Sequence, residues 1–254
     1  MARTDFTTPR LCLACDLSEG ATAALSPDEG NYLVNVLRLT RGARVLAFNG
    51  RDGEFAASLA AHARKSVALT IAAQIRRPQT PPDIDFLFAP LKHARLDYMA
   101  QKAVEMGAGR LRPVMTRRTQ VARLNLERFE ANAIEAAEQC GAVWTPQVVP
   151  LEPLDKALSE WPAERLIVFC DEEAPQADPL AALSEAKRVA DAGVLVGPEG
   201  GFDERERAAI LAVPRVLRLS LGPRVLRAET AAVAALALVQ AVIGDWRPRG
   251  PNEG

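Results

Sequence analysis

The chain has 254 residues, 48% of them hydrophobic and 25% charged, which is the composition of a folded globular protein with room for one large or two small domains. Four scattered cysteines are too few for a disulfide framework, and the first ten residues hold no hydrophobic signal segment, so we expect a cytoplasmic protein. The net charge is −1, but the two halves of the chain differ in charge. Residues 1–125 are basic, with 18 Lys and Arg against 11 Asp and Glu, whereas residues 126–254 are acidic, with 13 against 21.

The first 75 residues predict a small β-rich domain, which we expect to be a partly open barrel. A helix should begin after Ser26, the predicted N-cap, with Pro27 in its first turn and Glu29 as the reciprocal capping residue. The sequence NGRDG at 49–53 is a strong signal for a hairpin turn. The expected strands cover residues 11–17, 43–50, 53–60 and 65–75.

A proline-rich stretch then marks a domain boundary. RRPQTPPD, residues 76–83, holds three prolines that resist both a helix and a central strand, so we expect a linker there. From residue 84 to residue 254, strands alternate with helices, as is typical of an α/β domain with a mostly parallel sheet. The apolar run at 231–244 is too short to cross a bilayer and is predicted as a buried helix. The expected strands cover 84–91, 111–115, 165–171, 192–198 and 215–221, and two of the expected helices cover 96–107 and 126–141.

The first glycine-rich loop, LVGPEGGFDERE, follows a strand at residues 195–206. It has neither the Walker lysine and spacing nor GxGxxG, which excludes the common nucleotide-binding motifs. A tight turn before a helix capped by Asp203 and Glu206 would explain it without any ligand. Its place at the carboxyl end of an apolar strand nevertheless favours a ligand site, because open α/β sheets bind ligands at that edge. Adjacent glycines would also let a ligand reach the backbone.

A second loop lies in LGPRVLRAETA, residues 221–231, where Gly222 and Pro223 follow the next strand. Arg224, Arg227 and Glu229 stand directly before an almost uncharged helix. Charged side chains beside a buried helix need partners or a function. The simple structural alternative is that Arg227 and Glu229 pair with each other at the start of the helix.

The two loops together resemble the C-terminal signatures of the RsmE family, the 16S ribosomal RNA uridine N3-methyltransferases of the SPOUT superfamily. The resemblance extends over nearly the whole chain, through PRLCLACDL, NYLVNVLRLTRGARV, QKAVEMGAGRLRPVMTRRTQ and EAAEQC. The sequence departs from the family at GAVW (Gly141 to Trp144), where many members carry an arginine. Any RNA contact that the family makes from that arginine is therefore not expected here.

This resemblance implies an α/β fold of two domains. Residues 1–75 would form a PUA-like RNA-binding β-barrel domain and residues 84–254 a SPOUT methyltransferase domain with a C-terminal trefoil knot. The implied partners are 16S ribosomal RNA or the small ribosomal subunit and a second copy of the chain, with no membrane and no metal. The implied cofactor is S-adenosyl-L-methionine, bound by Leu195, Val196, Gly197, Pro198, Glu199, Gly200, Gly201, Leu219, Ser220, Leu221, Gly222 and Leu226.

The reaction requires charge close to the acceptor base. N3 of uridine is a weakly acidic imide, so its methylation needs the proton removed or the developing anion stabilised. We expect Arg227, or in second place Arg224, to supply the positive charge, with Glu199 or Glu229 orienting it or taking the proton. The basic first half suits RNA phosphate, although scattered surface arginines would give the same balance. The predicted RNA contacts are Arg10, Arg38, Arg117 and Arg118.

Other patterns are given no role in the reaction. Cys12 and Cys15 have a CxxC spacing but no second pair, so a metal is not expected. The acidic run at 171–173 is interpreted as a solvated turn that could border the cofactor site. Two other functions stay open: a SPOUT enzyme that modifies a ribose 2′-hydroxyl or another base, and a non-catalytic RNA-binding protein.

Overall fold

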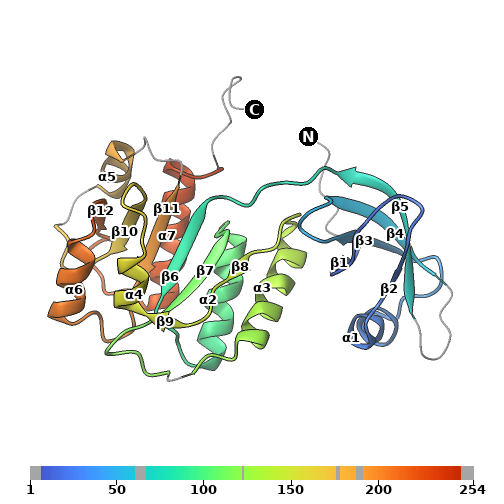
Figure 1. Ribbon diagram of the computed structural model, residues 1–254, viewed down its shortest axis with the longest axis horizontal. Coiled ribbons are helices and arrows are strands. Elements are labelled where there is room, and N and C mark those ends of the chain that lie inside the picture. The colour runs from blue at the N-terminus through green and yellow to red at the C-terminus, as the bar shows by residue number, and fades with distance from the viewer. Residues whose placement is uncertain (1–6, 61–66, 122, 176–177, 187–190, 247–254) are drawn as a thin grey trace. The chain divides into compact units, whose positions relative to one another are not determined.

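The structure is a computed structural model that describes residues 7–60, 67–121, 123–175, 178–186 and 191–246 (Figure 1). Its internal contacts divide the chain into two compact units. Unit 1 comprises Met1–Thr80 together with Ala137–Thr145, and unit 2 comprises Pro81–Ala136 together with Pro146–Gly254.

Unit 1 is built on a five-stranded sheet in the order β1-β3-β4-β5-β2, in which β1 pairs with β3 in parallel and the other pairs are antiparallel. The predicted hairpin is confirmed, because the turn at residues 49–53 joins β3 to β4. The sequence did not predict β2, which has only three residues. The strands are β1 (Arg10–Cys12), β2 (Thr22–Ala24), β3 (Arg44–Phe48), β4 (Glu54–Leu59) and β5 (Ala68–Arg76).

One helical segment packs on this sheet and begins as predicted. The Ser26 side chain accepts a hydrogen bond from the backbone of Glu29, whose side chain accepts one from the backbone of Ser26. This capping box starts α1 (Pro27–Asn31), and the helix continues as a π-helical turn, η1 (Tyr32–Val36). Leu33 from η1 is fully buried in the core of the unit, so the turn contributes directly to packing.

Arg10 is part of the interior of unit 1 and does not lie on an RNA-facing surface. Its side chain is 4% exposed, and its Nε lies 2.7 Å from Oε1 of Glu54. Its terminal nitrogens donate to the carbonyl oxygens of Ala137, Glu138 and Ala142 at 2.6–2.7 Å. The prediction that Arg10 contacts RNA is therefore wrong, because its guanidinium is already enclosed by protein acceptors.

Glu54 receives a second arginine, so it serves as the shared carboxylate of a buried cluster. Arg76 donates to it from Nε at 2.6 Å and from Nη2 at 2.8 Å. Burial alone would raise the pKa of the Glu54 carboxyl, but the hydrogen bonds from Arg76 and Arg10 outweigh burial and lower that pKa. The first residues of the PRLCLACDL segment thus have a structural role.

Unit 2 contains a sheet in the order β12-β10-β11-β6-β7-β8, in which neighbouring strands run parallel. The short strand β9 pairs with β7 in parallel beside it. The predicted α/β class with a parallel sheet is confirmed. The strands are β6 (Ile84–Phe88), β7 (Arg110–Met115), β8 (Gln147–Val148), β9 (Glu152–Pro153), β10 (Leu166–Cys170), β11 (Ala192–Val196) and β12 (Val216–Leu219).

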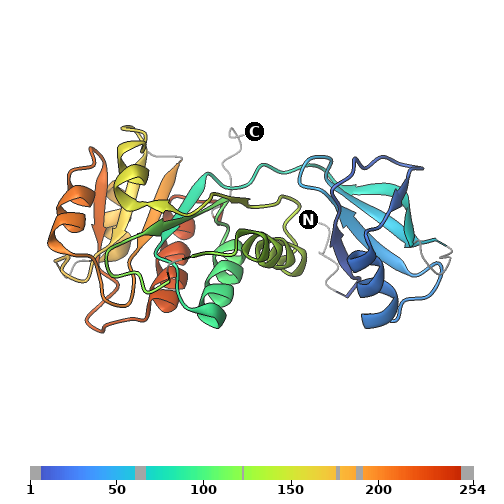
Figure 2. The same ribbon diagram turned by 60° about the horizontal axis from the view of Figure 1, so that its bottom comes forward.

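Helices cover both faces of this sheet. Helix α7 contacts both α2 and α5 on one face, where Figure 2 shows α2 beside α7, and α4 packs with α6 on the other face. None of the helices in the described ranges is long and apolar enough to cross a membrane. The helices are α2 (His93–Glu105), α3 (Leu126–Cys140), α4 (Leu154–Ser159), α5 (Pro179–Glu185), α6 (Glu204–Leu211) and α7 (Ala228–Val242).

The parallel arrangement determines where a site can form. The carboxyl ends of β10, β11 and β12 lie at one edge, since the three strands pair in register in the same direction. The segments that leave these strands, at residues 171–173, 197–202 and 220–227, therefore meet at that edge.

Candidate cofactor site

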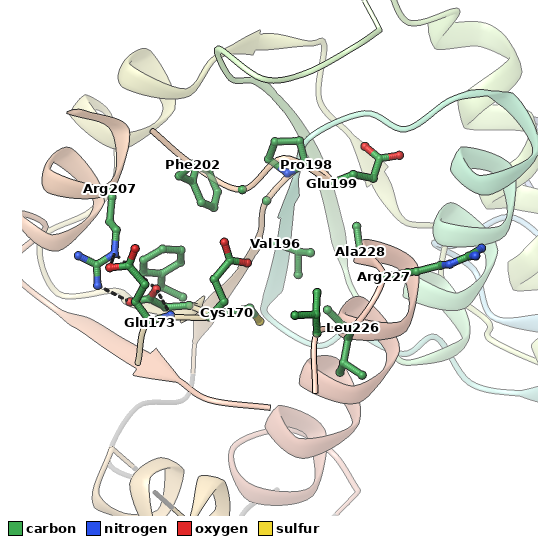
Figure 3. A pocket seen from close by; sticks show the side chains of 17 residues that line it. Cys170, Glu173, Val196, Pro198, Glu199, Phe202, Arg207, Leu226, Arg227 and Ala228 are labelled. Atoms are coloured by element: carbon green, nitrogen blue, oxygen red, sulfur yellow. Dashed lines mark hydrogen bonds and ion pairs between the residues drawn. The ribbon is translucent and has the colours of Figure 1, made fainter. Parts of the chain in front are cut away.

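A cavity of about 260 Å³ lies where these three segments meet (Figure 3). Its walls combine apolar side chains, carboxylates and glycine backbone. A second cavity of about 160 Å³ adjoins it and shares the segment around Asp171 and the segment around Leu226. The first cavity is lined by Phe169, Cys170, Asp171, Glu172, Glu173, Val196, Gly197, Pro198, Glu199, Gly201, Phe202, Arg207, Val225, Leu226, Arg227, Ala228 and Ala231.

The structure brings most of the predicted cofactor residues to these two cavities. Two do not line either one: Leu195 is fully buried in the core, and Gly200 is exposed beside Arg118. The first cavity is lined by Val196, Gly197, Pro198, Glu199, Gly201 and Leu226 from the predicted set. The second is lined by Leu219, Ser220, Leu221, Gly222 and again Leu226.

The glycines of the first loop are required by close packing. A Cβ at Gly197 would lie 2.7 Å from Cε2 of Phe202. Gly201 has a φ of +68°, and a Cβ there would lie 2.6 Å from Oε1 of Glu172. Larger residues would push these neighbours into the cavity or distort the turn. The loop then enters α6 through the predicted capping box of Asp203 and Glu206, which is confirmed.

The segment after β10 is a wall of the site that the sequence interpretation undervalued. Asp171 is 5% exposed and accepts hydrogen bonds from Arg207 at 2.9 Å and Arg218 at 2.6 Å. Burial would raise the pKa of the Asp171 carboxyl, but the two arginines and the backbone of Glu173 outweigh it and lower that pKa. Interpretation as a solvated turn is therefore wrong for Asp171. The signal that could have revealed it is a charged residue directly after the apolar strand.

Glu172 differs from its neighbours because its charge is not neutralised by the protein. Its side chain lines both cavities, and within the described ranges it makes no hydrogen bond or ion pair. Glu173 by contrast approaches Arg207 at 3.4 Å. Nearby, burial raises the pKa of the Cys170 thiol to about 12, so this residue is a neutral part of the wall and not a nucleophile.

The predicted catalytic residues lie on the rim of the first cavity. Arg227 is exposed, and Figure 3 shows its guanidinium directed away from the cavity. In the described part of the chain, Arg227 and Glu229 do not form an ion pair, and one buried carboxylate oxygen of Glu229 has no partner. Glu199 pairs instead with Arg95 at 3.1 Å, a residue that the sequence did not single out. Arg224 is exposed and lines only the second cavity.

Two predicted RNA contacts lie against the first glycine loop. Arg118 donates from Nη1 to the carbonyl oxygen of Gly200 at 2.6 Å. The Arg117 backbone donates to Glu206 at 2.7 Å, and its side chain approaches Asp203 at 3.2 Å. Arg38, in unit 1, is exposed and has a positive φ of 54°. In the ranges that the structure describes, we find no cluster of three side chains that could hold a metal ion.

The lining fits an adenosyl sulfonium compound better than a phosphate ester. Apolar side chains such as Val196, Pro198 and Leu226 can cover a purine. Glu172 offers a carboxylate without a protein partner, which would attract a cation and repel an anion.

Comparisons with known proteins agree with this arrangement. A family model described as an RNA methyltransferase domain matches residues 78–240, and one described as an RNA methyltransferase PUA domain matches residues 25–72. A ribosomal RNA small subunit methyltransferase E of Rickettsia conorii is 28% identical, and the match covers 91% of this chain and 94% of that protein.

Two solved structures have the same fold over nearly the full chain. One is the ribosomal RNA small subunit methyltransferase E of Neisseria gonorrhoeae bound to S-adenosyl methionine, with 30% identity, a TM-score of 0.82 and coverage of 94% of this chain and 100% of that chain. The other is a putative methyltransferase of Legionella pneumophila in complex with the same molecule, with 29% identity, a TM-score of 0.77 and coverage of 92% and 97%.

The fold and the site together define an RNA methyltransferase that carries a PUA domain. Within that class, the chain belongs to the RsmE family, the ribosomal RNA small subunit methyltransferases E.

Proposed function

We propose that this protein transfers a methyl group from S-adenosyl-L-methionine to N3 of a uridine in the 16S ribosomal RNA of the small subunit. The observation that carries the proposal is the pair of adjoining cavities between the two glycine loops at the carboxyl edge of the parallel sheet. Relatives that match over nearly the whole chain are named ribosomal RNA small subunit methyltransferases, and the Neisseria relative binds the proposed donor.

The proposed cofactor contacts are the predicted residues that line the cavities, together with Glu172. The donor supplies a methyl group on a positively charged sulfur. Gly197 and Gly201 allow a tight turn against Phe202 and Glu172, and the backbone groups that are not bonded within this turn would bind the adenine edge. The backbone of residues 219–222 and Leu226 would line the other side.

The acceptor would approach from the rim, where Arg227 stands without a protein partner in the described structure. A guanidinium about 4 Å from the uracil oxygens, at an effective dielectric of about 20, would stabilise the developing anion by roughly 4 kcal/mol. That corresponds to about three decades in rate. Since Glu199 is paired with Arg95, Glu229 is the better candidate to orient Arg227 or to accept the proton.

A second copy of the chain would complete the site. Val225, 95% exposed at the tip of the second loop, supports a covering surface, because a large apolar side chain there stands fully in solvent in the single chain. The homodimer, the trefoil knot and the cytoplasmic location implied by the resemblance form part of this proposal.

The experiment is to map modified nucleotides in 16S ribosomal RNA from cells with and without the gene. We expect one N3-methyluridine to be lost in the deletion strain and restored by the wild-type gene but not by an Arg227→Ala variant. Loss of a 2′-O-methyl group or of another modified base instead would contradict the acceptor. An unchanged modification pattern would contradict the activity on this RNA.

A further inference from the structure

A separate cavity of about 280 Å³ lies in unit 2, away from the residues that line the cofactor site. It is formed where the chain passes from β6 into α2 and where it enters α3. Its floor is apolar, with Leu91, Leu96 and Phe129 all at most 9% exposed. Its remaining lining residues are Lys92, Asp97, Val121, Arg123, Leu124, Asn125 and Arg128.

The charges around this cavity are unbalanced. Arg128 and Asn132 both bind the Asp97 carboxylate, so that carboxylate is neutralised within the protein. Lys92 and Arg123 are exposed, and in the described part of the chain neither side chain has a hydrogen bond or an ion pair. The cavity therefore presents two free cations above an apolar floor.

The start of α2 adds to this positive potential. Lys92 is the N-cap of the helix, and no side chain caps its first turn. The positive end of the helix dipole therefore lies at the rim of the cavity.

Helix α2 connects this cavity to the cofactor site. Arg95, one turn after Lys92, pairs with Glu199 of the first glycine loop at 3.1 Å. Lys92 thus lies at the same helix end that contacts the wall of the cofactor cavity, whereas Arg123 comes from the segment before α3. A polyanion bound here would contact the helix end from which Arg95 reaches the first glycine loop.

We propose that this cavity binds the backbone of the RNA substrate, with Lys92 and Arg123 each contacting a phosphate. This inference rests on the proposed function, since it takes RNA to be the substrate. An apolar floor with a cationic rim suits a nucleotide, whose base is largely apolar in its faces and whose phosphate is anionic. Neither residue was predicted from the sequence, where they stand as isolated cations.

The test uses fluorescence anisotropy with a fluorescein-labelled decamer of uridine at 50–200 mM KCl. Lys92→Gln and Arg123→Gln remove one charge each and keep a polar side chain of moderate size. We expect each variant to weaken binding about three- to tenfold at the low-salt end. Each should also flatten the slope of log affinity against log salt by roughly 0.7, the contribution of one single-stranded phosphate.

Arg205→Gln is the matched control, because Arg205 is an exposed cation of unit 2 that lines a different cavity between α4 and α6. It should leave both the affinity and the slope unchanged. S-adenosyl-L-methionine binding, measured by calorimetry on the same proteins, should stay within twofold of the wild type for all three variants.

The outcomes separate this proposal from the function on which it rests. A wild-type protein that does not bind S-adenosyl-L-methionine would contradict the proposed function. If the donor binds but the wild type does not bind the decamer, or the Lys92 and Arg123 variants keep the wild-type slope, the RNA-binding cavity is rejected. An equal change in the Arg205 variant would also reject it, because the effect would then come from overall charge.

Discussion

Arg118 donates a hydrogen bond of 2.6 Å to the carbonyl oxygen of Gly200, and so holds the first glycine loop from outside the cofactor cavity. The contact joins the turn after β7 to the turn after β11. A side chain predicted to bind RNA therefore has a different partner in this structure, and its removal should act on the donor site.

Replacing Arg118 with alanine should weaken S-adenosyl-L-methionine binding. The lost hydrogen bond is charge-assisted but exposed, so we expect about 1 kcal/mol, or roughly a fivefold rise in Kd. Calorimetric titration measures the Kd of S-adenosyl-L-methionine. Arg118→Lys should recover part of the affinity, and Arg205→Ala should change nothing. If the Kd of the donor did not change and the RNA affinity depended less on salt, Arg118 would contact RNA and not support the donor site.

Glu172 should favour binding of S-adenosyl-L-methionine, whose sulfur is positively charged, over S-adenosylhomocysteine, whose sulfur is neutral. In Glu172→Gln the Kd of the donor should rise about three- to tenfold, because a partly screened attraction of about 1 kcal/mol is removed. The Kd of S-adenosylhomocysteine should change by less than twofold. Glu173→Gln is the control, since Arg207 already faces that carboxylate. Equal losses for both ligands would show that Glu172 contacts a hydroxyl group and not the charge.

Arg227→Ala should strongly reduce turnover but leave the affinity for the methyl donor nearly unchanged. We expect methyl transfer to unmodified small subunits to fall about a hundred- to a thousandfold, while the Kd of S-adenosyl-L-methionine stays within twofold. Incorporation of labelled methyl groups measures the first quantity and calorimetry the second. Arg224→Ala should be much milder, because Arg224 lines the second cavity alone. Turnover near the wild-type rate would exclude Arg227 from the reaction.

The regular elements were the part of the fold that local sequence could predict. Both capping boxes, at Ser26 and Asp203, were confirmed because their side chains bond within three residues. The three-residue strand β2 and the two-residue strands β8 and β9 were missed, because they are defined by pairing with distant strands. The helices α4 and α5 are too short to show a clear period of their own.

The site was predictable where glycines marked it and not where distant charges meet. Both glycine loops were found from the sequence and lie at the cavities. The partners of Glu199 and Arg10 were not found, since Arg95 is 104 positions from the first and Glu54 is 44 positions from the second. Such pairs depend on which strands become neighbours, and this information is absent from any local pattern.

Glu54 makes unit 1 sensitive to acid. Its pKa is lowered in the folded protein, so its contribution to stability is present above its ordinary value of 4.5 and is lost as the pH falls through the folded-state pKa. Glu54→Gln would leave Arg10 buried without its counter-charge and should lower the free energy of unfolding by roughly 3–5 kcal/mol at pH 7.

Denaturant titrations from pH 7 to pH 3 measure this effect. The difference in free energy of unfolding between the wild type and Glu54→Gln should become smaller below pH 4.5. Asp16→Asn is the control, because the Asp16 side chain is 95% exposed in its pair with Arg51, and it should cost less than about 1 kcal/mol. If the difference in free energy of unfolding stayed constant through this range, the stabilisation would not come from the ionised Glu54 carboxylate.

A crystal structure grown with S-adenosyl-L-methionine tests the central claim most directly. We expect density for the ligand between residues 197–201 and 219–226, with backbone groups of these loops on its adenine and the Glu172 carboxylate on its charged end. Ligand bound elsewhere, or loops closed on their own side chains in a protein that still transfers methyl groups, would contradict it.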